Sequence, residues 1–510
     1  MKHAVLAVLV AACGGRASAP AVQPAAAVGL PAARWVPASP AYVFASETFG
    51  EGQHGLREAI ELVGNIAGFD LRDVSQAVTG ILGVDALSAD PLAAIGVDLK
   101  SSWAVFSDDL SPTIVLRLAA PDQMVAFLDH QRERGLVTQS VIVDGTEVFS
   151  ASLIGGVKVG WAIAGDWMWI HFTLPFVSED DKEGARWFAS SHGAHRAAWT
   201  DDWVWAKAAT RAAAGLVGYL GHRTVARLLA ALPPAVACGR LVRLAEPGRV
   251  AIALEGDGHR FGARIAVEIA STAAVRAMLL PPPSGWDAAT AHAGLAAQWN
   301  LDAVAARAWL GQNGAPCLAL AGDLPARLDE IGARTARAAV LGFDPDAMSG
   351  TGAVAFDLAS PSFFERQLDR IPLRRAVERQ RTFGAHRGAA IAIPFSVTVE
   401  YVLEPTLAIA ALGDGLLARV VAPGPAKPPP SAVPIAAIDL EPPVLSAAAW
   451  EAALHLVADQ QLSGTAGPAI KRAVELLLRL RDAHLAVTAE SGSMSAAPDA
   501  IVLSVSGNRR

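Results

Sequence analysis

A repeated order of apolar runs, prolines and tight turns is the feature that most constrains the fold of this chain. In the first half, the apolar run 113–118 is followed by Pro121, a helical stretch, and turns at Asp144-Gly145 and Gly165-Asp166. Asp-Gly between alternating apolar residues is the strongest local signal for a tight hairpin. Consecutive hairpins predict antiparallel strands, because parallel strands need long crossover connections.

A similar order follows the break at Pro281-Pro282-Pro283-Ser284-Gly285. The run 352–358 precedes Ser360-Pro361 and a helical stretch, and the runs 407–410 and 416–420 flank Gly413-Asp414 as the earlier strands flank Gly165-Asp166. The final runs, 485–489 and 501–505, predict a hairpin that corresponds to the one formed by 250–254 and 265–269. The shift between equivalent features is about 240 residues, which is typical of an internal repeat.

We therefore predict an α+β fold of two similar tandem domains, 39–280 and 281–510, with mainly antiparallel sheets packed by helices. The length of 510 residues agrees with more than one domain. Helical spacing predicts further helices at 56–66, 208–232 and 469–480. The alternative is that strand–proline–helix units and Gly-Asp turns recur by chance, since both are common in α+β proteins.

The first residues have the composition of an export leader. Met1-Lys2-His3 is basic, residues 4–10 are apolar, and Val10-Ala11-Ala12-Cys13 places small residues before a cysteine. This apolar run is too short to span a bilayer, which needs roughly 20 residues. Basic start, apolar core and small residues in this order are typical of a signal peptide. The alternative is an alanine-rich terminus with a chance cysteine.

The leader resembles the signal and lipobox of bacterial lipoproteins. The resemblance implies that 1–13 is a lipoprotein signal ending at Cys13, which becomes the lipid attachment site. Gly14 stands where an aspartate would indicate inner-membrane retention, so the expected location is the outer membrane, facing the periplasm. Residues 14–38 are rich in alanine and proline, which predicts a flexible tether. The body is also similar to a family of exported bacterial proteins of comparable length, and that likeness assigns no site.

Composition narrows the possible partners. The chain is 52% hydrophobic and 18% charged, which is typical of a folded protein. The net charge of -7 gives no electrostatic reason to expect binding of nucleic acid, which usually requires a basic face. Beyond Cys13, the cysteines are Cys238 and Cys317. They form either a disulfide, which an exported protein can keep, or two buried thiols.

Tryptophans gather in one region, with seven of the 13 lying between residues 161 and 205. Trp167 and Trp169 alternate along one predicted strand and therefore share a face. We take Trp161, Trp167 and Trp169 as candidate ligand-binding residues for an apolar ligand, since aromatic side chains dominate such surfaces. The alternative is a core sheet covered by helices on both faces.

His192, His195, Asp201 and Asp202 lie between these tryptophans, as weak candidates for a hydrolase or a metal site. The chain has no His-Glu-x-x-His, paired-cysteine or Gly-x-Ser-x-Gly spacing, so we assign no catalytic residue and no metal ligand. The alternative interpretation is a solvated polar loop.

Together these features predict a membrane-anchored periplasmic lipoprotein that works by binding or scaffolding at the cell envelope. Its expected partners are the membrane, through the lipid, and an envelope protein or an apolar ligand; no cofactor or nucleic acid is expected. A carrier of an apolar ligand and an envelope hydrolase with dispersed catalytic residues remain the alternatives. Whether the protein is an enzyme is left open, with the non-catalytic interpretation preferred.

Overall fold

The computed structural model describes most of the two predicted halves. It covers residues 30–57, 83–173, 201–225, 248–313, 328–422, 433–445, 480–491 and 499–509, with short gaps inside these ranges, and a few single residues elsewhere. Cys13, Cys238, Cys317, His192, His195 and residues 469–479 of the predicted helix 469–480 lie outside the described residues, as does most of the predicted helix 56–66. The last residue of the former helix, Leu480, lies in a strand.

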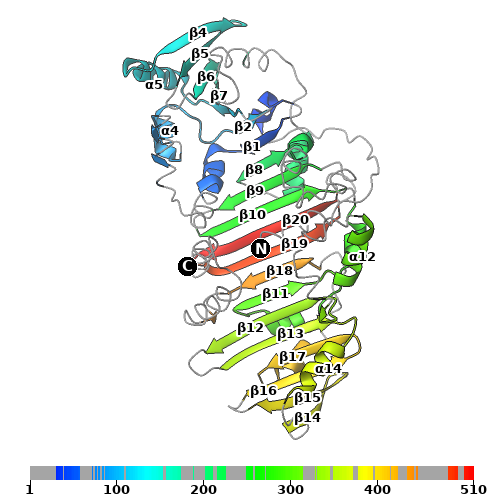
Figure 1. Cartoon of the computed structure of the whole chain (residues 1–510). Coiled ribbons are helices and arrows are strands. Elements are labelled where there is room, and N and C mark those ends of the chain that lie inside the picture. Colours follow the sequence, from blue (N-terminus) through cyan, green and yellow to red (C-terminus); the bar gives the residue numbers. More distant parts are fainter. Residues whose placement is uncertain are drawn as a thin grey trace.

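Twenty described strands form one continuous sheet in which every neighbouring pair is antiparallel (Figure 1). From one edge to the other the order is β4-β5-β6-β7-β3-β2-β1-β8-β9-β10-β20-β19-β18-β11-β12-β13-β17-β16-β15-β14. The last strand, β20, pairs with β10 and so joins the two halves of the chain at the middle of the sheet. The α+β class and the antiparallel pairing agree with the sequence prediction.

The strands of the first half have the following bounds: β1 Tyr42–Ser46, β2 Trp103–Ser107, β3 Thr113–Arg117, β4 Thr138–Val143, β5 Thr146–Ser152, β6 Lys158–Ala164, β7 Trp167–Thr173, β8 Leu216–Leu220, β9 Val250–Gly256 and β10 Arg260–Glu268. Those of the second half are β11 Leu295–Trp299, β12 Ala336–Asp344, β13 Ser349–Asp357, β14 Glu378–Phe383, β15 His386–Ile393, β16 Val397–Glu404, β17 Leu407–Leu412, β18 Ala436–Leu440, β19 Leu480–Glu490 and β20 Ala500–Arg509.

Helices cover both faces of the sheet. On the first face, which carries Tyr219, Val502 and Ala353, lie the 3-10 helix η1 (Pro31–Trp35), α7 (Asp201–Thr210), α11 (Trp286–Thr290) and α16 (Leu416–Val420). On the second face lie α4 (Ala89–Ala94), α5 (Pro121–Glu133), α10 (Ala273–Ala277), α12 (Ala303–Asn313) and α14 (Ser362–Asp369). Apolar side chains therefore point to both faces of most strands, which fits a sheet buried on both sides.

Several elements that local sequence signals predict are present in the structure. Pro121 is the first residue of α5, where the missing N–H of proline costs nothing. The predicted hairpin at Asp144-Gly145 joins β4 to β5, and both residues have positive φ, 49° and 80°. Two positive φ angles define the turn that matches the twist of paired strands. The predicted hairpins β6–β7, β9–β10 and β19–β20 also form.

Two predicted elements are wrong, the first of them in part. Residues 208–210 belong to α7 and residues 222–225 are helical, but Leu216–Leu220 form β8. A central strand that is buried on both faces has an unbroken apolar run, which does not show the period of a strand. The run 416–420 is helix α16, so Gly413 does not lie in a strand–strand turn. The strand–strand turn in this region is instead Pro405-Thr406, which joins β16 to β17.

The end of the predicted tether belongs to the folded body. Within η1 and its flanks, Leu30, Ala32, Ala33 and Val36 are buried against the first face of the sheet. Ala32 N–H donates to the Ser102 hydroxyl at 2.9 Å. A flexible segment would leave these apolar side chains in water, so the ordered chain begins no later than residue 30.

Candidate functional site

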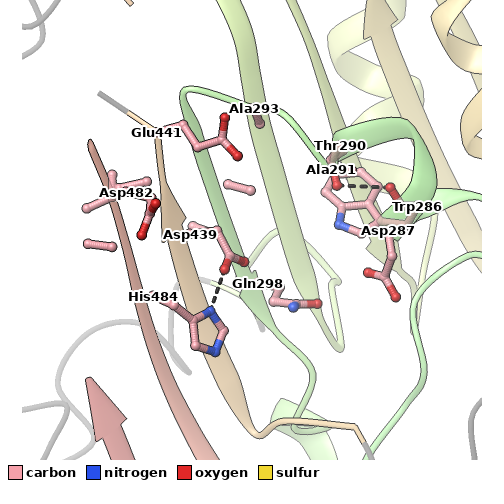
Figure 2. Close-up of a pocket in the computed structure, with 14 residues that line it drawn as sticks. Trp286, Asp287, Thr290, Ala291, Ala293, Gln298, Asp439, Glu441, Asp482 and His484 are labelled. Carbon is pink, nitrogen blue, oxygen red and sulfur yellow. Dashed lines mark hydrogen bonds and ion pairs between the residues drawn. The ribbon is translucent and has the colours of Figure 1, made fainter. Parts of the chain in front are cut away.

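A cavity of about 350 Å³ lies on the first face, between α11 on one side and the strands β18 and β19 on the other, with β11 between them (Figure 2). It is placed next to the central β19–β20–β10 pairings, between the part of the face covered by α7 and the part covered by α11 and α16. The lining residues are Trp286, Asp287, Thr290, Ala291, Ala293, Ala296, Ala297, Gln298, Asp439, Leu440, Glu441, Asp482, Ala483 and His484.

The floor of this pocket is built from side chains that alternate along neighbouring strands. Asp439 on β18 is directly opposite His484 on β19, and Gln298 on β11 is directly opposite Ala437. Opposed residues on antiparallel strands share a face and lie close together. Strand register, not sequence proximity, therefore brings these polar groups together.

His484 and Asp439 form a hydrogen-bonded pair through Nδ1 and Oδ1, drawn as a dashed line in Figure 2. The hydrogen bond to the Asp439 carboxylate raises the pKa of His484 above its ordinary value, against the opposing effect of partial burial. A carboxylate on Nδ1 also orients the ring and leaves Nε2 as the atom available to a ligand.

Two further carboxylates lie close by: Asp482 is on β19, and Glu441 directly follows β18. Asp482 accepts two hydrogen bonds from the amide of Asn508, at 2.9 and 3.0 Å. Glu441 lies 3.7 Å from Nδ1 of His292, whose side chain is 89% exposed. These groups make the rim and floor of the pocket rich in hydrogen-bond acceptors.

Asp287 enters the pocket from α11. Its neighbour Trp286 is 2% exposed and packs in the core under α16, which fixes the helix. Burial raises the pKa of Asp287, and the nearby Asp439 charge raises it further, while the Arg337 guanidinium lowers it. Burial outweighs the cation, so this carboxyl holds its proton more tightly than an exposed aspartate.

Arg337 on β12 supports the wall beside Asp287 and is itself completely buried. Its guanidinium donates to Asn300 Oδ1 at 2.8 Å, Asp357 Oδ2 at 2.9 Å, the Thr335 hydroxyl at 3.1 Å and the Leu280 carbonyl at 2.8 Å. Burial lowers the pKa of Arg337, which is opposed by Asp357. A buried guanidinium with these partners holds β11, β12 and β13 in a fixed arrangement next to the pocket.

The candidate ligand-binding tryptophans lie elsewhere, in the core of the first half. Trp161, Trp167 and Trp169 are 4%, 4% and 2% exposed. Trp169 meets Trp35 edge-on with ring centroids 4.6 Å apart, and Trp161 stacks on Phe149 at 5.7 Å. This packing agrees with the alternative interpretation, in which the three tryptophans belong to a core sheet. None of the three lines the pocket. Their role in ligand binding stays a prediction.

Of the weak hydrolase candidates, only Asp202 has a described side chain. It pairs with Arg249 at 2.7 Å, and Arg249 also pairs with Glu268 at 2.8 Å and lies over the Trp205 ring at 4.4 Å. This is a structural ion-pair network that ties α7 to β9 and β10. Within the described ranges, no group of three or more His, Cys, Asp or Glu side chains is arranged to hold a metal ion.

The chain was compared with family models, curated proteins and solved structures. No family model matches it, and no curated protein matches it. Among solved structures, crystal forms IV, I and III of TP0453 match 49% of this chain and 81%, 79% and 80% of their own chains. The sequence identities are 12%, 11% and 11%, and the TM-scores are 0.23, 0.25 and 0.22. Among the described helices, none combines the length and apolar character needed to cross a bilayer.

Proposed function

We propose that this chain is a membrane-anchored periplasmic lipoprotein, attached through Cys13 to the outer membrane, which acts by binding at the cell envelope. The observation that carries the binding part is the cavity beside α11, with its hydrogen-bonded His484–Asp439 pair and three further carboxylates. The strands that form this cavity lie in the middle of the sheet and are paired with a neighbouring strand on each side. Their polar groups are therefore preorganised, and such groups bind a ligand with a smaller entropy cost.

The carboxylates in the lining favour a small polar ligand that carries hydrogen-bond donors. Asp439, Glu441, Asp482 and ionised Asp287 are acceptors, and His484 supplies at most one balancing positive charge. An amine or a hydroxyl-rich molecule fits this set better than the apolar ligand predicted from the tryptophans. The volume suits a small molecule, since ligand pockets start near 300 Å³.

The proposal includes an internal duplication of the body. The segment β3–α5–β4–β5–β6–β7 has the strand order 3-7-6-5-4, and β13–α14–β14–β15–β16–β17 has the order 13-17-16-15-14. The remaining strands of each half also follow one order, 3-2-1-8-9-10 and 13-12-11-18-19-20. Two unrelated folds of ten strands would rarely share every neighbour.

Backbone detail supports the same proposal. The Gly96 carbonyl accepts from Ala119 and Ala120 at 2.8 and 3.2 Å, and the Gly332 carbonyl accepts from Ala359 and Ser360 at the same two distances. Both glycines have positive φ, and the bridges Val97–Leu118 and Ala333–Leu358 follow directly. The loop before the helix therefore makes the same backbone hydrogen bonds in both halves, which supports the proposed duplication.

The anchor is tested by metabolic labelling with a fatty acid in the native host. The wild type should be labelled and should fractionate with the outer membrane, whereas Cys13→Ser should be unlabelled. Equal labelling of the two proteins, or release of the wild type as a soluble protein, would contradict the anchor.

A second candidate function is an envelope hydrolase, favoured by one row of residues. Ser506, His484 and Asp439 are directly opposite one another on β20, β19 and β18, which is the order of nucleophile, base and orienting acid. The His484–Asp439 hydrogen bond is present in the structure. Substrate binding would have to bring the Ser506 hydroxyl within hydrogen-bonding distance of the His484 ring. Hydrolysis of ester or peptide substrates that Ser506→Ala abolishes would establish this candidate over simple binding.

A further inference from the structure

The two edges of the described sheet differ in chemistry. β14, at one edge, carries Glu378, Arg379 and Arg381, and charges of this kind protect an edge from pairing with another chain. β4, at the opposite edge, has the sequence Thr-Gln-Ser-Val-Ile-Val without a charge (Figure 1). The β4 edge therefore lacks the protection that its counterpart has.

The β4 edge is also apolar and open to solvent. Ile142 is 75% exposed, and Val137, just before the strand, is 82% exposed. Val141 is 44% exposed. β4 pairs only with β5 among the described strands, so its outer backbone groups are available to a further strand.

We propose that β4 pairs with β4 of a second copy of this chain, so that the sheet continues through a two-fold axis. A two-fold axis perpendicular to the sheet keeps every residue on its own face. Since opposed residues share a face, the numbers of paired residues must add up to an even value. The pairing segment runs from Leu136, directly after the turn at Arg134-Gly135, to Val143 at the end of β4. Two registers lie nearest its middle: one with Gln139 opposite Gln139, and one with Ser140 opposite Ser140.

Side-chain chemistry selects the register centred on Gln139. In this register Val141 of each copy lies opposite Val137 of the other copy. Both of these exposed valines are therefore buried in the contact. Asp144 of each copy also lies beside the turn of the other copy that contains Arg134. Asp144 and Arg134 are exposed and have no ion-pair partner within the described residues. In the register centred on Ser140, Val141 would face Gln139 and this charge match would be lost.

The contact is one short strand from each copy, so the dimer is expected to depend on protein concentration. Its geometry is closed: each copy has one β4 edge, and the charged β14 edges remain outside. The assembly therefore stops at two copies and does not grow into a filament.

Cysteine cross-linking of the full-length protein in detergent tests the register. Opposed Cβ atoms on paired strands lie within reach of a disulfide. Under mild oxidation, Gln139→Cys should give a covalent dimer, whereas Ser140→Cys and the β14 control Gln380→Cys should stay at the wild-type background. A Ser140→Cys dimer without a Gln139→Cys dimer would overturn the register.

Sedimentation of the otherwise native chain tests the interface independently of oxidation. Val141→Lys should shift the protein to monomer, while Arg381→Ala on β14 should leave the dimer unchanged. A wild type that stays monomeric at high concentration would overturn the proposal. The same holds for a monomer that binds phosphatidylglycerol vesicles through Val137 and Ile142, since the patch would then meet lipid.

Discussion

His484 and Asp439 are 45 residues apart in the chain, yet they stand directly opposite each other on β19 and β18 and share a hydrogen bond. Only the correct pairing of these two strands creates the pair, because a shift of one residue would turn His484 to the other face of the sheet. The state of this pair therefore reports both the register at the centre of the sheet and the chemistry of the pocket.

We expect Asp439→Asn to lower the pKa of His484 toward its ordinary value, because the hydrogen bond to the carboxylate is the main cause of the rise. The raised pKa adds stability that is fully present below the ordinary histidine value and is lost as pH rises through the folded value. Half of each side chain is exposed, so this contribution is under about 1 kcal/mol. An NMR titration of the His484 ring protons measures the shift, and an unchanged midpoint in the variant would refute the assignment.

Asp287→Asn should stabilise the protein at neutral pH. The pKa of Asp287 is raised, chiefly by burial, so ionisation above the ordinary aspartate value costs folding free energy. Asparagine removes that cost, and the difference from wild type should vanish below the ordinary value, where both side chains are neutral. Thermal unfolding at pH 7 and pH 3 checks this sign. A variant that is less stable at pH 7 would show that attraction to Arg337 outweighs burial.

Arg337→Ala should destabilise the second half by about 3–5 kcal/mol, because it removes the buried guanidinium that donates to Asn300 and Asp357. Asp357 then keeps the Thr335 hydroxyl as a donor but loses its cationic partner. Arg117→Ala is the matched control. Arg117 also pairs with a carboxylate, that of Asp166, but the two side chains are 47% and 45% exposed. Denaturant unfolding compares the two, and an equal loss in both variants would contradict the special role of Arg337.

Gly96→Ala and Gly332→Ala should each cost at least about 1–2 kcal/mol, because both positions have positive φ. A Cβ atom would also lie 2.3 Å from the Ala120 carbonyl oxygen at Gly96 and 2.6 Å from that of Ser360 at Gly332. Gly342→Ala is the control, since a Cβ there meets no atom within 4 Å. Unfolding of all three variants tests the duplication; a loss at only one of the two equivalent glycines would argue against it.

The sequence predicted the elements whose signals are local. Pro121 opens α5, Asp144-Gly145 forms a turn with positive φ, and the alternation in 485–489 and 501–505 gives the last hairpin. It missed β8 and most strands between 295 and 404, which are rich in alanine or charge and lack a clear period of two. A single sheet could not be foreseen, because the β10–β20 pairing joins segments more than 200 residues apart.

The pocket was beyond local signals as well. The predicted hairpin began at Leu485, one residue after His484, and nothing near Asp439 indicated a strand. One sequence signal could have placed His484 in the sheet. It stands two and four residues before Ala486 and Thr488, so in an extended strand the three side chains share a face. The tryptophan cluster was prominent in sequence, yet large aromatic side chains are mostly buried, and Trp161, Trp167 and Trp169 are no exception.

The most direct test of the binding account is native mass spectrometry of the lipidated protein, purified from its own envelope without denaturation. Wild type should carry an additional small-molecule mass, which Asp439→Asn and His484→Ala should lose. His386→Ala is the matched control, because His386 makes the same kind of hydrogen bond, to Glu404 at 2.9 Å, outside the pocket. The account predicts that this control keeps the ligand mass. Bare wild-type protein, or the same ligand mass on all four proteins, would contradict it.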